Sequence, residues 1–190
     1  MTNKLNLLLD TNSKEQLKGL VGEHLERVLT ESVGSEMALL AVLETKNRKV
    51  LIRNNVDLHF EYGDEFIQLV VSERTTAENN KHVSIPQDNG ELIYELSTQY
   101  ENLGTIAGIR IVNDRVEWEN ENGVFEAEAD VAIIIDLDGG RQIIFQAVDS
   151  LAGFIAYCDD EEMLDSVEGQ WKMKTDSLKS HSRTVNSMEA

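Results

Sequence analysis

Strict alternation of apolar and charged residues is the feature that most constrains the fold of this chain. Residues 116–136 read VEWENENGVFEAEADVAIIID. Successive side chains of a β-strand point to opposite faces, so this alternation is typical of a sheet with one buried face and one solvated face. The segment therefore predicts two antiparallel strands joined by a turn at residues 120–123.

The same alternation predicts how the side chains divide between the two faces. Val116 and Trp118 mark the apolar face of the first strand. In the second strand that face holds Phe125, Ala127, Ala129, Val131, Ile133 and Ile135. The opposite face gathers five carboxylates with no lysine or arginine among them: Glu117, Glu119, Glu126, Glu128 and Asp130. Like charges that face each other across a sheet cost a few tenths to about 1 kcal/mol per pair.

The charge of the whole chain is also strongly acidic. The formal net charge is -18, and residues 113–168 alone hold 16 acids and two bases, Arg115 and Arg141. Such a charge keeps a protein in solution and opposes unaided binding to nucleic acid or to an anionic membrane. We therefore expect neither nucleic acid nor a membrane as a direct partner.

Two interpretations of the acidic face remain open. It is either the solvated side of a half-buried sheet or a surface that docks on a basic region of another protein, where charge complementarity selects the partner. The second interpretation covers inhibitors that occupy a nucleic-acid site, immunity proteins that cap a toxic nuclease, and viral proteins that block a defence enzyme. The residues predicted to bind the partner are Glu117, Trp118, Glu119, Glu126, Glu128 and Asp130, with Trp118 or Tyr157 as an aromatic anchor.

Two alternative functions come from other classes. One is a metal binder or metal-dependent enzyme that uses Asp130, Asp136 and Asp138; the other is a structural module that forms a homodimer through a helix face or a sheet edge. An enzyme is not the expectation, because the sequence has no phosphate-binding glycine loop, HExxH, GxSxG or paired CxxC motif. A nuclease pattern on Asp136 and Gln146 would need a lysine where Val148 stands. No cofactor is predicted.

The remaining pattern predicts an α+β protein, with an N-terminal amphipathic helix packed on a mainly antiparallel twisted sheet. Apolar residues recur at helical spacing in residues 13–33, where Asn12 or Ser13 is the expected cap. Strand hairpins are expected to turn near residues 46–48 and 62–64, and further turns at residues 113–114 and 138–140. Residues 1–171 are assigned to one domain, with a candidate boundary between two related β-rich halves at residues 75–90. Residues 172–190 are assigned to a flexible polar tail.

Cysteine usage bears on the compartment. Cys158 is the one cysteine in the sequence, so no disulfide forms within the chain, and this suits a reducing compartment. The apolar run near the N-terminus is too short for a signal peptide, and no apolar run is long enough for a membrane span. We therefore expect a cytoplasmic protein.

Overall fold

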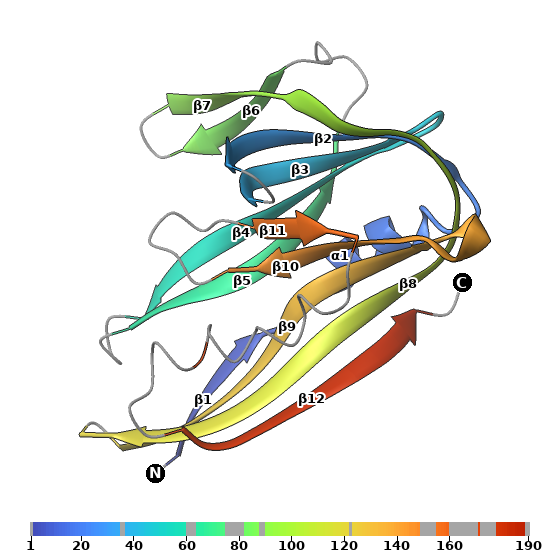
Figure 1. Ribbon diagram of the computed structural model, residues 1–190. Coiled ribbons are helices and arrows are strands. Elements are labelled where there is room, and N and C mark those ends of the chain that lie inside the picture. Colours follow the sequence, from blue (N-terminus) through green and yellow to red (C-terminus); the bar gives the residue numbers. More distant parts are fainter. Residues whose placement is uncertain are drawn as a thin grey trace.

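The computed structural model describes nine segments of the chain: residues 2–34, 37–59, 64–74, 82–87, 90–121, 123–148, 155–159, 171 and 178–188 (Figure 1). In these segments the protein is mostly β, with one short helix and a large mixed sheet. The elements are β1 (Thr2–Leu7), α1 (Thr11–Lys18), β2 (His24–Gly34), β3 (Met37–Thr45), β4 (Lys49–His59), β5 (Asp64–Glu73), β6 (His82–Gln87), β7 (Gly90–Glu95), β8 (Ser97–Asn120), β9 (Gly123–Leu137), β10 (Gln142–Ala147), β11 (Ile155–Cys158) and β12 (Leu178–Met188). The predicted α+β class is therefore wrong.

Ten of the strands form one sheet. Its pairings make a closed ring that runs from β9 through β10, β11, β3, β2 and β8 back to β9. The order is β1-β9-β10-β11-β3-β2-β8-β12, and β8 also pairs with β9, while β4 and β5 extend the sheet from β3. All of these pairs are antiparallel except β1 with β9. The remaining strands, β6 and β7, form a separate two-stranded sheet. Because β2 pairs with β8, strands on both sides of residues 75–90 belong to the same sheet.

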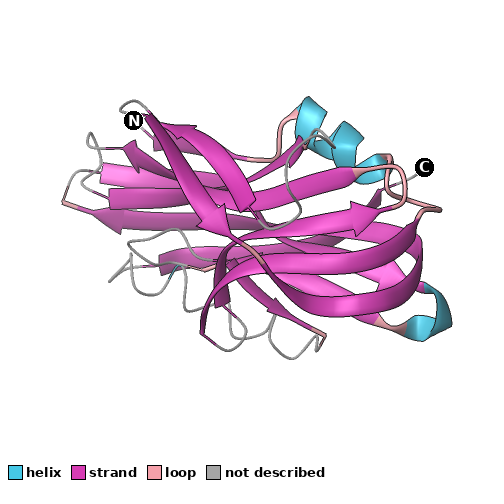
Figure 2. Ribbon diagram, turned by 90° about the horizontal axis from the view of Figure 1, so that it is seen from above, coloured by secondary structure: helices cyan, strands magenta, loops and turns pink. Residues whose placement is uncertain are grey.

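The helix predicted at residues 13–33 is much shorter than expected. Asp10 caps α1 by accepting the Ser13 N–H at 2.6 Å, and Gly19 caps the other end beside the Arg48 side chain. Gly22 then takes a positive φ of 87°, and the chain continues as β2. Figure 2 shows that α1 lies at the same end of the molecule as the turn at Asp138–Gly140, and that strands make up nearly all the rest.

Irregular pairing explains why β2 resembles a helix in sequence. The register between β2 and β3 shifts between Leu25 and Arg27, so the strand does not alternate strictly. As a result Leu25 and Val28 lie in one core cluster, whereas Leu29 lies in another. A bulge that places residues three apart on one face imitates the helical period.

Three apolar clusters stabilise this arrangement. The main core lies inside the bent sheet and includes Leu17 and Leu20 beside strand residues such as Phe145. A second cluster, here called the ribbon core, lies on the other side of β8 and β9 and contains Trp118. The third cluster packs the β6–β7 hairpin against β2, β3 and β4. Burial of apolar surface in such clusters is the dominant favourable term in folding.

Several predicted turns and strands are confirmed and others are wrong. β3 pairs with β4 across residues 46–48, β8 with β9 across residues 120–123, and β9 with β10 across the turn at Asp138–Gly140. The expected turn at residues 113–114 is wrong, since β8 runs through it as one strand. Leu178–Met188, assigned to the flexible tail, form β12 and pair with β8. Residues 62–63, where the second hairpin was expected to turn, lie outside the described residues.

Candidate functional site

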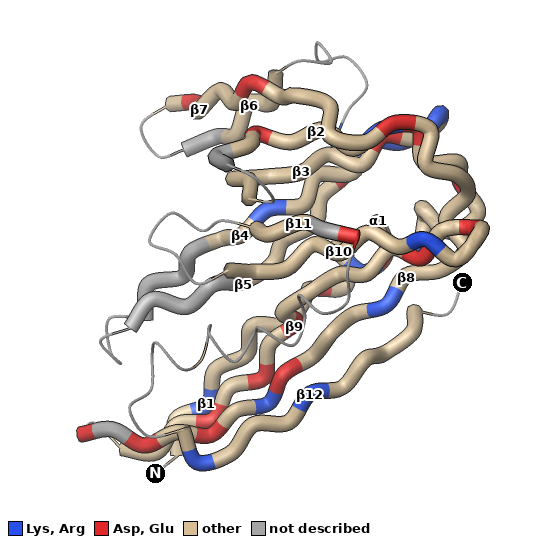
Figure 3. The backbone as a smooth tube through the Cα atoms, viewed as in Figure 1, with Lys and Arg blue, Asp and Glu red and all other residues tan. Residues whose placement is uncertain are grey.

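The five predicted carboxylates lie on one side of the ribbon formed by β8 and β9. Glu117 faces Glu126 directly, while Glu128 faces Arg115 and Asp130 faces Asn113. On the other side Trp118 faces Phe125, and their rings stack with centroids 5.2 Å apart. The alternation in the sequence therefore predicted this part of the site. Figure 3 shows acidic and basic positions interleaved along the lower ends of β8, β9 and β12.

A β-bulge limits the acidic face to one end of the ribbon. Val112 pairs with Ala132 but Asn113 pairs with Asp130, so Val131 is an extra residue in β9. Beyond the bulge, Ile133 and Ile135 lie on the same side as the carboxylates and belong to the main core. The prediction that these isoleucines share the face of Phe125 is wrong, because alternation carries no signal for the inserted residue.

Lysines and an arginine of the same chain lie against most of the carboxylates. Lys4 of β1 contacts Glu126 at 2.9 Å, Arg115 contacts Glu128 at 2.9 Å, and Lys179 of β12 contacts Glu119. The hydrogen bond to Glu126 raises the pKa of Lys4, and the hydrogen bond to Glu119 raises the pKa of Lys179. The expectation of an acidic face with no balancing base is therefore wrong. Lys4 and Lys179 come from strands far away in sequence, so local composition could not reveal them.

Glu117 is the exception among the five. In the described part of the chain, no lysine or arginine lies within ion-pair distance of its carboxylate. It faces Glu126 across the ribbon, and its other neighbour in register is Ser180 of β12. The centre of the face therefore keeps a directly opposed pair of like charges.

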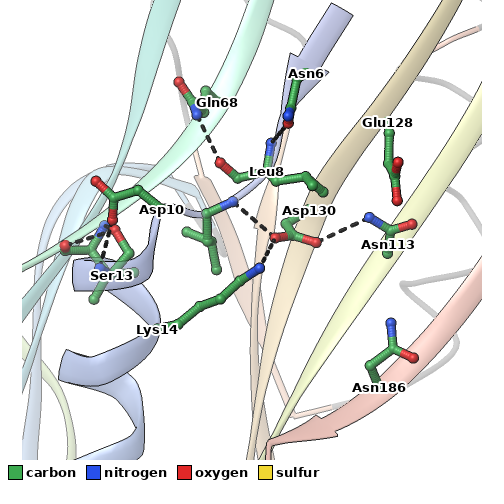
Figure 4. Close-up of polar contacts among 12 residues, drawn as sticks. Asn6, Leu8, Asp10, Ser13, Lys14, Gln68, Asn113, Glu128, Asp130 and Asn186 are labelled. Atoms are coloured by element: carbon green, nitrogen blue, oxygen red, sulfur yellow. Dashed lines mark hydrogen bonds and ion pairs between the residues drawn. The ribbon is translucent and has the colours of Figure 1, made fainter.

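The buried Asp130 side chain binds groups from three other parts of the chain. Its side chain accepts the Leu9 backbone N–H at 2.9 Å and the Asn113 amide N–H at 3.1 Å, and Lys14 Nζ lies 3.6 Å away (Figure 4). The residue is 5% exposed. These contacts join β9 to β8, to α1 and to the chain after β1. Asp130 therefore has a structural role, and the other four carboxylates are the ones more accessible to a partner.

Two polar hollows adjoin each other on this face. The first, of about 540 Å³, lies over the opposed glutamates, and the second, of about 430 Å³, lies beside Asp130. Arg115, Glu128 and Ser182 line both. The first is completed by Lys4, Leu5, Asn6, Val116, Glu117, Glu126, Ala127 and Ser180, and the second by Leu8, Lys14, Asn113, Asp130, Thr184 and Asn186. Together they make a groove across β1, β9, β8 and β12, which we call the polar groove.

Neither predicted aromatic anchor reaches this groove. Trp118 is 2% exposed in the ribbon core, and Tyr157 is 5% exposed in the main core, where its ring meets Tyr100 edge to face. Both side chains therefore pack inside the protein, and neither is on the surface where a partner would dock.

The three aspartates of the metal hypothesis are not brought together. Asp130 lies on the main-core side of β9, whereas Asp136 is bound by Arg110 on the other side, with N–O distances of 2.8 and 2.6 Å. Asp138 lies in the exposed turn after β9. Among the described residues there is no group of three histidine, cysteine, aspartate or glutamate side chains arranged to hold a metal ion.

Asp114, a buried aspartate that was not among the predicted site residues, links β8 to β12. Asp114 is fully buried, and Arg183 of β12 donates to both of its oxygens at 2.7 Å. The Trp171 indole N–H donates to the same carboxylate at 3.1 Å, and His181 Nε2 lies 3.2 Å from it. Sequence reasoning assigned Asp114 to a turn and Arg183 to a tail, and nothing local to either position links the two.

No family model, no curated protein and no solved structure matches this chain. Within the described residues, no helix has the length and apolar character needed to cross a membrane. The polar groove and the charge of the chain are therefore the features that bear on its function.

Proposed function

We propose that this chain is a protein-binding module of the inhibitor or immunity type, which covers a basic surface of a partner protein, such as a nucleic-acid-binding site. The observation that carries the proposal is the direct opposition of Glu117 and Glu126 on an open face beside a hollow of about 540 Å³. Such an opposition of like charges destabilises a sheet by a few tenths to about 1 kcal/mol, and the Lys4 ion pair with Glu126 offsets part of that cost. An arginine or lysine of a partner, placed between the two carboxylates, removes that repulsion.

The ion pairs around the opposed glutamates are weak enough to be exchanged. The Lys4 and Glu126 side chains are 75% and 45% exposed, and those of Arg115 and Glu128 are 70% and 39% exposed. Exposed ion pairs of this kind contribute little to stability, because water screens the charges and pairing restricts both side chains. A guanidinium from a partner forms two parallel hydrogen bonds with a carboxylate, which a lysine does not. Exchange of Lys4 for an arginine of the partner at Glu126 therefore costs little free energy. The guanidinium also matches the geometry of the carboxylate better than the lysine does.

The charge of the whole chain favours the same kind of partner. With a net charge of -18, the protein attracts a basic surface from a distance and repels nucleic acid. Carboxylates and phosphates both present negative oxygens to arginine, so a surface that binds nucleic acid matches this protein chemically. The proposal includes a cytoplasmic location, which rests on a single cysteine and hence no disulfide within the chain.

A double substitution tests the groove. Glu117→Gln with Glu126→Gln removes both opposed charges while keeping the side-chain shape. We expect this variant, used as bait in a lysate of the source organism, to lose a basic protein that the wild type captures. Capture by the wild type should also weaken as salt is raised, because screening shortens the range of charge attraction to about 3 Å at 1 M.

Glu26→Gln with Glu73→Gln is the matched control. Both residues are exposed, lie outside the polar groove, and are described without an ion pair, so the pair removes the same charge elsewhere. If both variants lose the partner equally, the net charge matters and the groove does not. If neither variant loses it and capture is independent of salt, the proposed function is wrong.

A further inference from the structure

The free edge of β7 is a second surface of interest, and it lies far from the polar groove (Figure 1). Ile93 is 65% exposed, the highest value among the exposed large apolar side chains of the described residues. Its partner in β6 is Ser84, so it lies on the outer face of the hairpin, opposite the face on which Ile85 packs. Glu91 and Glu95 lie two residues to either side of Ile93 in the strand, and their side chains therefore share its face.

The backbone of β7 is open on its outer side at every second residue. Pro86 has no N–H, so its pair with Glu91 is one of those without mutual hydrogen bonds. At the other end of β6 the Arg74 guanidinium donates to the His82 carbonyl, which therefore points away from β7. Pairs with and without hydrogen bonds alternate in an antiparallel ladder. Ile93 and the two glutamates beside it therefore direct their N–H and C=O groups out of the hairpin.

The two edges of this hairpin differ in their protection. The edge of β6 carries Pro86, and Arg74 lies against its backbone at His82. β7 reads GELIYE, with no lysine or proline and no break in register, and in the described chain it pairs only with β6. Lysine, proline and bulges are the features that commonly keep an edge strand from pairing. Of the two edges, β7 is therefore the one open to another strand.

The charge on this edge determines which strand it fits. Within the described residues, neither Glu91 nor Glu95 has a lysine or arginine at ion-pair distance, and Glu91 accepts a hydrogen bond from Ser84 at 2.7 Å. A second copy of this chain centred on Ile93 would place Glu91 opposite Glu95, and like charges in that position destabilise a sheet. A strand with basic residues there pairs opposite charges instead, and the net charge of -18 attracts it.

We propose that β7 binds an extended basic segment of a partner protein, which adds to the hairpin as an antiparallel strand. Residues directly opposite each other share a face, so the segment carries an apolar residue opposite Ile93 and a basic residue two positions to either side. Backbone hydrogen bonds to β7 supply affinity, and the alternating side chains supply selectivity. The residue opposite Leu92, which is 48% exposed, covers that side chain on the other face. This site is separate from the polar groove and goes beyond the proposed function.

Titration of the full chain with a short peptide tests the proposal. The probe is Arg-Thr-Val-Thr-Arg with a glycine at each end, blocked termini and a fluorophore for anisotropy. We expect it to bind, and to bind more weakly as salt is raised from about 0.05 M to about 0.5 M. The same peptide with an N-methylated valine keeps its charge but cannot donate to the Ile93 carbonyl. It should bind at least about tenfold more weakly, because that carbonyl then loses its partner.

Two variants of β7 test the site from the side of the protein. Ile93→Pro removes an N–H that points out of the hairpin and leaves the bonds to β6 in place, as Pro86 does on the other strand. We expect it to weaken binding at least about tenfold, with circular dichroism as the check on folding. Glu91→Gln with Glu95→Gln should weaken binding about threefold or more at about 0.05 M salt, because it removes both pairs of opposite charges.

The polar-groove variant is the matched control, and it separates this proposal from the proposed function. Glu117→Gln with Glu126→Gln removes the same charge outside β7 and should leave peptide binding within about twofold of the wild type. A peptide that this variant fails to bind would lie in the groove, and the assignment to β7 would be wrong.

Three other outcomes overturn the proposal. The first is no binding at up to about 1 mM peptide, a concentration at which even a weak site is occupied. The second is equal binding of the N-methylated peptide, which would show attraction by charge without strand pairing. The third is a dimer in sedimentation velocity that Ile93→Pro abolishes, since a second copy would then occupy the edge.

Discussion

Two aspartates of the β8–β9 ribbon are buried, and their partners show how differently one residue type can be used. Asp114 is held by the Arg183 guanidinium and the Trp171 indole on one side of the ribbon. Asp130 is held on the other side by a backbone N–H, the Asn113 amide and Lys14. In each case the carboxylate joins strands that are far apart in the chain, and this stabilises the tertiary structure.

Replacing Asp114 should therefore be much more costly than replacing an exposed acid. Asp114→Leu removes the buried carboxylate that the Arg183 guanidinium binds. Breaking a buried pair by removing one partner costs about 3–5 kcal/mol. Urea denaturation should show a loss in that range, while Glu128→Gln, which breaks the exposed pair with Arg115, should cost at most about 1 kcal/mol. Similar losses for the two variants would contradict the buried role of Asp114.

The cap of α1 gives a prediction that depends on pH. The Ser13 backbone N–H donates to Asp10 and lowers the pKa of that carboxyl below its usual 3.8. Because the pKa is lower in the folded protein, the cap contributes fully above the unfolded value and is lost as pH falls through the folded value. Asp10→Ala should cost about 1 kcal/mol near neutral pH.

The same variant should cost little in acid. Comparing urea midpoints of wild type and Asp10→Ala at about pH 7 and about pH 2 isolates the charged cap. A difference that stays constant between the two pH values would show that the carboxylate charge has no part in capping α1.

Among the secondary-structure elements, the conformation of Gly22 distinguishes the observed fold from the continuous helix predicted at residues 13–33. Its φ is 87°, and a Cβ added there meets nothing within 4 Å, so only backbone strain opposes a larger residue. Gly22→Ala should destabilise the protein by about 1–2 kcal/mol. In a continuous helix the same change would stabilise by about 1 kcal/mol, because alanine is the better helix former.

Asparagine provides the control at this position. Gly22→Asn should cost less than Gly22→Ala, since asparagine tolerates positive φ better than alanine. The free energies of unfolding from urea titrations decide the matter. A stabilising Gly22→Ala would mean that residues after α1 are helical.

Alternation predicted the regular strands and missed the bulged ones. It placed β3, β4, β9 and β10 near their observed positions and put the five carboxylates on one side, but it divided β8 with a turn at residues 113–114. It failed at β2, where a register shift imitates a helical period, and at Val131, where one inserted residue exchanges the faces. Bulges are set by how two strands pair, and a single strand carries little trace of them.

β12 was missed for a different reason. Its sequence, LKSHSRTVNSM, is polar because both faces of the strand are largely exposed at the edge of the sheet. Its attachment comes from backbone pairing with β8 and from Arg183 reaching Asp114. Composition alone makes such a strand look like an unstructured tail, since it buries almost no apolar surface.

At the scale of the whole molecule, the candidate site was predicted in part. The acidic side chains of the polar groove come from one continuous segment, so the sequence could place them together. Arg115 of β8 lies in the same segment, but Lys4, which pairs with Glu126, comes from β1, and Lys179, which pairs with the neighbouring Glu119, comes from β12. These strands join the groove through the parallel pairing of β1 with β9 and the antiparallel pairing of β12 with β8. Such long-range pairings are not encoded in local spacing.

The net charge of -18 predicts how salt acts on the folded protein. Self-repulsion destabilises the compact state, and added salt screens it, whereas the exposed ion pairs of the groove contribute little that salt could remove. The free energy of unfolding in urea should therefore rise between about 0.02 M and about 0.5 M sodium chloride. Urea is the suitable denaturant because guanidinium chloride is itself a salt and would screen the charges during the titration. A free energy of unfolding that falls with salt would mean that ion pairs such as Lys4–Glu126 stabilise the fold more than the surplus negative charge destabilises it. In that case the carboxylates of the groove would be bound too strongly by lysine and arginine of the same chain to exchange them for those of a partner.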